Sequence, residues 1–230
     1  MSRLAPFALI FASALLPAAG LPAAPQEAAS NGGTLQGRVH FPDNKVPKGF
    51  LLSDSVLYLK GRGLEEAMAP SKGLPAASKG EAAQKVYLDQ VDITFTPHIL
   101  PVVKGTEILI RNNDSILHNI HTQSRKNKAF NRAQAPNMKL PVTFKKTEVI
   151  HVGCDIHSQM SAYIIVVPNS FFTKAAKDGS FQIPGVPAGK YELVCWHEGL
   201  KQVSVEVEVA AGRATEADVE FGKPIHSAVN

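Results

Sequence analysis

A thiol, an imidazole and a thioether lie within seven residues in the stretch Cys154-Asp155-Ile156-His157-Ser158-Gln159-Met160. A soft thiolate and thioether beside a borderline imidazole favour copper over hard cations. Blue-copper sites use two histidines, one cysteine and a weak axial methionine. This stretch supplies three of those four donors, so the sequence must provide a second histidine elsewhere.

A candidate for that histidine lies upstream, in residues 108–119. The apolar run Ile108-Leu109-Ile110 predicts a strand, and Arg111-Asn112-Asn113-Asp114 predicts a turn because Asn and Asp favour turn conformations. His118 lies just past this turn, four positions after Asp114. The pattern therefore predicts that a strand and turn deliver His118 toward the cysteine-containing stretch.

Taken together, the polar turn before His118-Asn119 and the later Cys-x2-His-x2-Met pattern resemble the cupredoxins, the family of plastocyanin and amicyanin, over residues 86–167. The short ligand loop is similar to that of amicyanin, whereas plastocyanin has a longer gap between its second histidine and its methionine. The resemblance implies a Greek-key β-sandwich in which Asn119 ties the two ligand loops together. It also implies one type 1 copper ion held by His118, Cys154, His157 and Met160.

The rest of the chain also favours an all-β protein. Short apolar or alternating runs separated by Pro and Gly recur along it, and no helical periodicity is sustained. Val203, Val205, Val207 and Val209 alternate with polar residues, which predicts a half-buried strand. The continuous run Ile164-Ile165-Val166-Val167 predicts a strand covered on both faces, by the sandwich core and by a neighbouring domain.

The tail after residue 170 resembles a second small β-sandwich, the carboxypeptidase regulatory-like, transthyretin-like domain. That family opens with a Gly-x-Val strand, which matches Gly37-Arg38-Val39, far upstream. We therefore expect a discontinuous domain made of residues 32–61 and 170–222, a linker at 62–84 and a cupredoxin domain at 85–169. In the rival layout, the early strands belong to the cupredoxin domain and the tail domain is shorter.

The first residues predict export. Arg3 precedes an uncharged apolar stretch that ends in small residues, which is typical of a signal peptide, here residues 1–24. The alternative is a retained anchor, which the prolines and alanines of this stretch disfavour. We expect a periplasmic or secreted protein with no membrane span after signal cleavage.

Two cysteines in an oxidising compartment raise the alternative of a disulfide between Cys154 and Cys195. Such a bond would leave the spacing of His118, His157 and Met160 without a reason. A buried, inert thiol is the favoured interpretation of Cys195. A second metal position at Cys195 and His197 lacks further ligands in the local sequence.

The charge pattern points to an acidic partner rather than to nucleic acid. The net charge is +4, and no nucleic-acid-binding motif is present. Residues 115–147 contain no acidic residue, whereas seven basic residues lie among them. This segment is either a solvated loop and edge or a docking surface for an acidic redox protein such as a cytochrome c or a dehydrogenase.

These patterns favour an electron carrier and not an enzyme. The alternative is a module that binds copper for delivery or sensing, while the second sandwich binds a carbohydrate or a protein. A multi-copper oxidase is disfavoured because the chain lacks His-x-His pairs. Nucleophilic catalysis by Cys154 is disfavoured because the four-ligand arrangement accounts for both Cys154 and His157.

Overall fold

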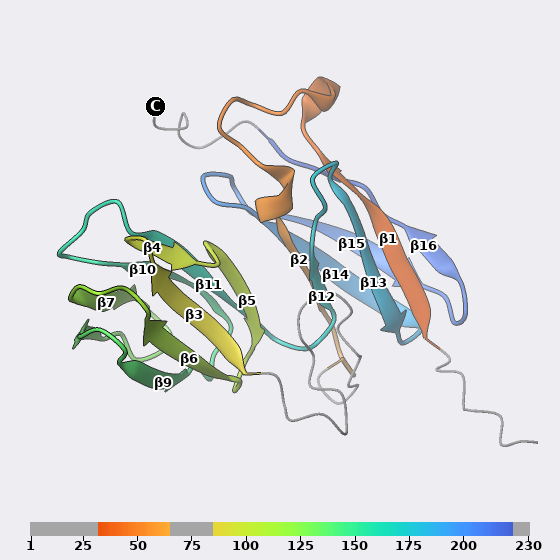
Figure 1. Cartoon of the computed structure of the whole chain (residues 1–230). Coiled ribbons are helices and arrows are strands. Elements are labelled where there is room, and N and C mark those ends of the chain that lie inside the picture. The colour runs from red at the N-terminus through yellow and green to blue at the C-terminus, as the bar shows by residue number, and fades with distance from the viewer. Residues whose placement is uncertain (1–31, 65–84, 223–230) are drawn as a thin grey trace, which may run out of the picture.

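The computed structural model describes residues 32–64 and 85–222, which form two β-sandwiches side by side (Figure 1). Two short 3-10 turns, Pro42–Asn44 and Leu52–Asp54, are the only helical segments in these residues. The prediction of an all-β protein is therefore confirmed.

The first sandwich is built from the two ends of the described chain. One sheet has the order β13 (Ser180–Val186), β1 (Gly33–His40) and β16 (Ala214–Glu216), and β17 (Val219–Glu220) also pairs with β1. The other sheet has the order β12 (Phe172–Lys174), β2 (Val56–Lys60), β14 (Gly189–Trp196) and β15 (Val203–Val209).

The second sandwich is built from the chain between them. One sheet has the order β5 (Ile99–Val103), β11 (Ser161–Val167), β10 (Glu148–Gly153), β7 (His118–Gln123) and β8 (Asn131–Gln134). The other sheet has the order β4 (Thr94–Thr96), β3 (Val86–Val91), β6 (Glu107–Asn112) and β9 (Lys139–Thr143).

The early strands pair with the late ones. Gly37 lies opposite Phe181, and Leu59 lies opposite Leu193, so the orange strands of Figure 1 lie beside the blue ones. A side chain at Gly37 would collide with the backbone carbonyl of Ala217, so glycine is needed for this close approach. Whether each sandwich folds by itself, as the predicted domain division requires, stays a prediction.

Each sandwich has its own core, and β11 separates the core of the second sandwich from the interface between the two sandwiches. Ile164 and Val166 face the core of the second sandwich. Ile165 and Val167 face the other way and pack with Tyr58 and other residues of the first sandwich. Successive side chains of a strand point to opposite faces, so the apolar run is buried on both sides. The prediction of a strand covered on both faces is confirmed.

Two predicted segments fall largely beyond these residues. The expected signal peptide, 1–24, and most of the expected linker lie outside the described residues. Of that linker, residues 62–64 are described, and Leu64 is fully buried in the core of the first sandwich. Within the described ranges, no helix has the length and apolarity needed to cross a membrane.

Candidate metal centre

Two neighbouring strands and one loop bring three candidate metal ligands together. His118 begins β7, and Cys154 follows β10, which pairs with β7. His157 lies on the loop after Cys154. The Nδ1 atoms of His118 and His157 are 3.0 Å apart, and Sγ of Cys154 lies 3.9 Å from Nδ1 of His157. The three donor atoms lie within 4.8 Å of one another, and the described chain holds no second group of this kind.

The loop between Cys154 and Met160 is closed by its own backbone. The backbone N–H of Met160 donates to the carbonyl of His157 at 3.0 Å, and that of Cys154 donates to the carbonyl of Met160 at 3.3 Å. Cys154 and Met160 are 6% and 2% exposed and share the core of the second sandwich. The loop therefore holds the thiol and the thioether where little of either residue is exposed to water.

Asn119 links the two segments that carry the donors. Its Oδ1 accepts the backbone N–H of Asp155 at 2.7 Å and lies 3.2 Å from Sγ of Cys154. Its Nδ2 donates to Oδ1 of Asn131 on β8 at 2.7 Å. Because Asn119 follows His118 directly, these bonds fix β7 relative to the cysteine loop.

Asp114 is a site residue that the sequence did not reveal. Its Oδ2 lies 2.7 Å from Nε2 of His118, whose side chain is fully buried. A carboxylate that accepts the Nε2 proton leaves the Nδ1 lone pair facing the other donors. The only signal in the sequence is an acidic residue four positions before the histidine, which the turn-forming Asn-Asn-Asp pattern explains equally well.

The carboxylate of Asp114 is itself held by a tight hairpin. It accepts the backbone N–H of Asp92 at 2.7 Å and that of Ile93 at 3.0 Å. Both residues have positive φ, 52° and 56°, as a two-residue turn between β3 and β4 requires. Burial alone would raise the pKa of Asp114, but the bonds from His118, Ile93 and Asp92 lower it. The carboxyl therefore stays ionised beside the imidazole.

Buried amides beneath this turn fix its shape. Asn112 is fully buried, and its Nδ2 donates to the backbone carbonyls of Ile116 and Gln134, at 2.9 Å each. Its Oδ1 accepts the backbone N–H of Asp114 at 2.9 Å. Gln134, 1% exposed, donates through Nε2 to the carbonyl of Ile110 at 3.0 Å. These contacts join residues far apart in the sequence, so local patterns could not reveal them.

Exposed apolar residues directly precede both histidines of the donor group, and His157 itself is partly buried. Ile156 is 51% exposed, and Leu117 and Ile116, which precede His118, are 49% and 40% exposed. Exposed apolar groups close together are typical of protein contact surfaces. The donor group therefore lies next to a surface suited to contact with another protein.

The two neighbouring histidines lie outside the donor group. Nδ1 of His121 lies 2.9 Å from Oδ1 of Asp155, and its side chain is 43% exposed. Nε2 of His151 lies 3.0 Å from Oγ of Ser161, and its ring packs against Tyr163. Both point away from the sandwich core, as strand parity predicts.

Cys195 belongs to the other sandwich. Both cysteines are free and buried, and Cys195 lies in the core of the first sandwich. Burial raises the pKa of its thiol. The ring nitrogens of His197 lie 2.9 Å and 2.6 Å from the backbone carbonyls of Leu51 and Glu198. The structure therefore offers Cys195 and His197 no further metal ligands among the described residues.

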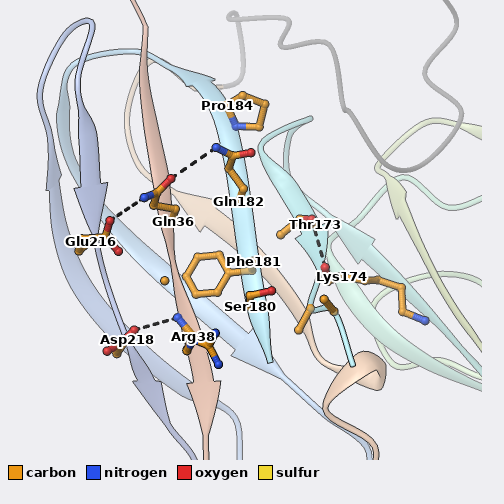
Figure 2. Close-up of a pocket in the computed structure, with 13 residues that line it drawn as sticks. Gln36, Arg38, Thr173, Lys174, Ser180, Phe181, Gln182, Pro184, Glu216 and Asp218 are labelled. Carbon is orange, nitrogen blue, oxygen red and sulfur yellow. Dashed lines mark hydrogen bonds between the residues drawn. The ribbon is translucent and has the colours of Figure 1, made fainter. Parts of the chain in front are cut away.

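A separate hollow lies on the first sandwich (Figure 2). Gln182, Gln36 and Glu216 form a row across β13, β1 and β16. Nε2 of Gln36 donates to Glu216 at 2.6 Å, and Nε2 of Gln182 donates to Oε1 of Gln36 at 3.4 Å. Arg38 and Asp218 lie beside the row, and the apolar Phe181 also lines the hollow.

Comparisons with known proteins give partial matches. A family model described as polysaccharide lyase family 4, domain II, matches residues 167–217. The chain matches no curated protein. No comparison supports the carboxypeptidase regulatory-like, transthyretin-like resemblance, which stays a prediction.

Similar solved structures are cupredoxin-type proteins. A purple cupredoxin from Nitrosopumilus maritimus is 19% identical, with 36% of this chain and 100% of that chain covered and a TM-score of 0.32. A copper-containing nitrite reductase from Thermus scotoductus SA-01 is 19% identical, with 44% and 28% covered and a TM-score of 0.36. A reduced amicyanin variant is 17% identical, with 44% and 97% covered and a TM-score of 0.34.

Proposed function

We propose that this protein holds one copper ion through His118, Cys154, His157 and Met160 and carries single electrons between redox partners. The observation that carries the proposal is the convergence of two imidazole nitrogens and a thiol within 4.8 Å, beside a buried methionine. Soft sulfur donors combined with imidazole suit copper. Bound copper would supply a centre that alternates between Cu(I) and Cu(II).

In this function, the role of the protein is to keep the four donor side chains in one arrangement. Asp114 fixes the tautomer of His118, and Asn119 fixes the loop that carries Cys154. The backbone bond from Cys154 to Met160 closes that loop on the buried side. Donor positions that do not move lower the reorganisation that accompanies a change in oxidation state, which favours fast electron transfer.

His157 and its apolar surroundings are the exit for the electron in this proposal. The imidazole is partly exposed, whereas Cys154 and His118 are buried. The partner is an acidic redox protein, such as a cytochrome c or a dehydrogenase, attracted by the basic segment 115–147. The location is the periplasm or the cell exterior, and the protein is a carrier and not an enzyme.

The competing function with the same residues is copper delivery or sensing. The two functions differ in whether the ion is kept when it is reduced. The test is voltammetry of the protein loaded with one equivalent of Cu(II), followed by measurement of retained copper after repeated cycles in the presence of a chelator. A carrier gives a reversible one-electron wave and keeps its copper. Loss of copper on reduction would favour delivery, and absence of any wave would contradict the carrier.

A second candidate function concerns the hollow of Figure 2. We propose that the row of Gln182, Gln36 and Glu216 binds a carbohydrate, because amides and carboxylates together donate and accept the hydrogen bonds of sugar hydroxyls. The partial match to a polysaccharide lyase domain agrees with this candidate. Dextran and alginate are suitable neutral and acidic probes. Binding should weaken in Gln36→Ala and persist in Gln202→Ala, and equal effects of the two substitutions would contradict the candidate.

A further inference from the structure

A groove lies between the outer edges of the two sheets of the second sandwich. β8 is the last strand of one sheet, and β9 is the last strand of the other. Neither edge is paired to a further strand among the described residues. The hollow between them has a volume of ≈ 510 Å³ and follows the continuous stretch from Leu140 to Lys146. Its length along a strand suits an extended chain.

The floor of this edge groove is apolar. Phe130, Leu140 and Val142 are only partly buried and pack against the core of the second sandwich. Phe144, 3% exposed, closes the bottom. The core thus reaches the surface here, where apolar side chains from another chain would remove it from water.

The rim of the edge groove is basic. None of the five cationic side chains that line it forms an ion pair with another described residue: Lys126, Lys128, Arg132, Lys145 and Lys146. The nearby Glu148 is already occupied, because it accepts bonds from Oγ of Ser124 and from the backbone N–H of Lys126 and other residues of that loop. The positive field of the rim is therefore available to an anionic ligand.

The walls of the edge groove are held in place before any ligand arrives. Oδ1 of Asn127 accepts the backbone N–H of both Lys145 and Lys146 at 2.9 Å, which joins the two loops of the rim. Phe130 donates its backbone N–H to Oγ1 of Thr122 at 2.9 Å and accepts the N–H of Thr122 at 2.9 Å. A wall that is already ordered does not have to be ordered on binding, which favours affinity.

The charge of the edge groove selects its occupant. A second copy of this chain would bring the same cations to the contact, and Pro141 on β9 lacks the N–H that edge pairing uses. The parts of the chain outside the described residues contain no acidic run: 65–84 holds three Glu and two Lys, and 223–230 holds no acidic residue. The fitting occupant is therefore a different, acidic protein.

We propose that the edge groove binds an extended protein segment in which acidic and apolar residues alternate. Alternate side chains of an extended segment point to opposite sides. Apolar side chains would then contact Phe130, Leu140 and Val142, while carboxylates would reach the lysines of the rim. The inference goes beyond the copper proposal, because no donor residue takes part in it and because it assigns five of the seven cations of segment 115–147 to this groove.

The test uses a fluorescein-labelled, acetylated peptide in which Glu alternates with Ile, and measures its binding by fluorescence anisotropy at low and high salt. Binding should weaken about tenfold or more in the double variant Lys145→Glu/Lys146→Glu. The matched control is Arg125→Glu/Lys139→Glu, which makes the same charge change at exposed positions that do not line the edge groove. Thermal melting of each variant checks that it is folded.

The apolar floor has its own test. Val142→Thr keeps the shape of the side chain, and it should reduce the preference for the alternating peptide over a peptide of Glu alone. If the control variant loses as much affinity as the rim variant, or if the all-Glu peptide and heparin compete as well as the alternating peptide, the surface is a general anion site and the proposal is wrong. No binding at all would also overturn it. Repeating the assay with Cys154→Ser separates this result from the copper proposal.

Discussion

At the scale of single residues, the hydrogen bonds that orient His118 are as important for the candidate metal site as the histidine itself. The spacing of Cys154, His157 and Met160 predicted three members of the candidate site, and a turn pattern predicted His118. Asp114 and Gln134 were not predicted as site residues, because their partners are set by how distant strands meet. Sequence spacing finds donors that share a loop, whereas the residues that orient them depend on tertiary contacts.

Asp114→Asn should raise the reduction potential of the copper-loaded protein. The amide removes a negative charge that favours the more positive oxidation state, while it keeps nearly the same shape. A tenfold change in the relative affinity for the two states corresponds to about 59 mV, so we expect a rise on the order of 60 mV in voltammetry. Asp92→Asn is the control, because Asp92 contacts Asp114 through its backbone only. An unchanged or lowered potential in Asp114→Asn would contradict the role of the carboxylate.

Met160→Gln should lower the potential, because an oxygen donor stabilises Cu(II) relative to Cu(I) more than a thioether does. Voltammetry measures the change, and Met138→Gln is the matched control, since the side chain of Met138 is 48% exposed and accepts a backbone N–H from Ala135. The same potential in Met160→Gln and in the unsubstituted protein would show that Met160 is not a ligand.

At the scale of elements, strands with an apolar or alternating pattern were predictable, including β15 at a sheet edge, but polar strands were not. The apolar runs of β6, β10 and β11 stand out in the sequence. β8 consists of Asn131–Gln134, a polar stretch within a segment interpreted as a loop and edge. Its extended form comes from pairing with β7 and not from its own apolar pattern.

The loop that precedes β8 is anchored by Glu148. Burial alone would raise the pKa of Glu148, but bonds from Ser124, Arg125, Asn127 and Lys126 lower it to about 2. Because the pKa is lower in the folded state, the stabilisation is complete above the unfolded value of 4.5 and is lost as the pH falls toward 2.

Glu148→Gln should therefore lower the free energy of unfolding by about 2 kcal/mol at neutral pH. The difference from the unsubstituted protein should shrink below pH 4.5. Urea denaturation at several pH values measures this, and Glu107→Gln, at the exposed first position of β6, is the control. A loss of stability that is the same at every pH would show that the carboxylate charge is not its cause.

At the scale of the whole molecule, the predicted insertion of one sandwich into the other determines what can fold alone. Residues 85–169 contain all strands of the second sandwich. We expect this fragment to fold and bind copper, as circular dichroism and copper analysis would show. It should be less soluble than the full chain, because removal of the first sandwich exposes Ile99, Ile165 and Val167.

The matched fragment for this test runs from residue 33 to 168 and adds the early strands. In that fragment, β1 would lose its partners β13, β16 and β17, and β2 would lose its partners β12 and β14. If only the longer fragment folded and bound copper, the early strands would belong to the copper sandwich, and the predicted domain division would be wrong.

The absorption spectrum during titration with Cu(II) is the decisive test of a copper centre at His118, Cys154, His157 and Met160. Charge transfer from a cysteine thiolate to Cu(II) colours a type 1 site intensely. We predict an intense visible band that saturates at one equivalent in the unsubstituted protein and in Cys195→Ser, and that is absent in Cys154→Ser. A folded protein that stays colourless with Cu(II), or a band that survives in Cys154→Ser, would contradict the claim.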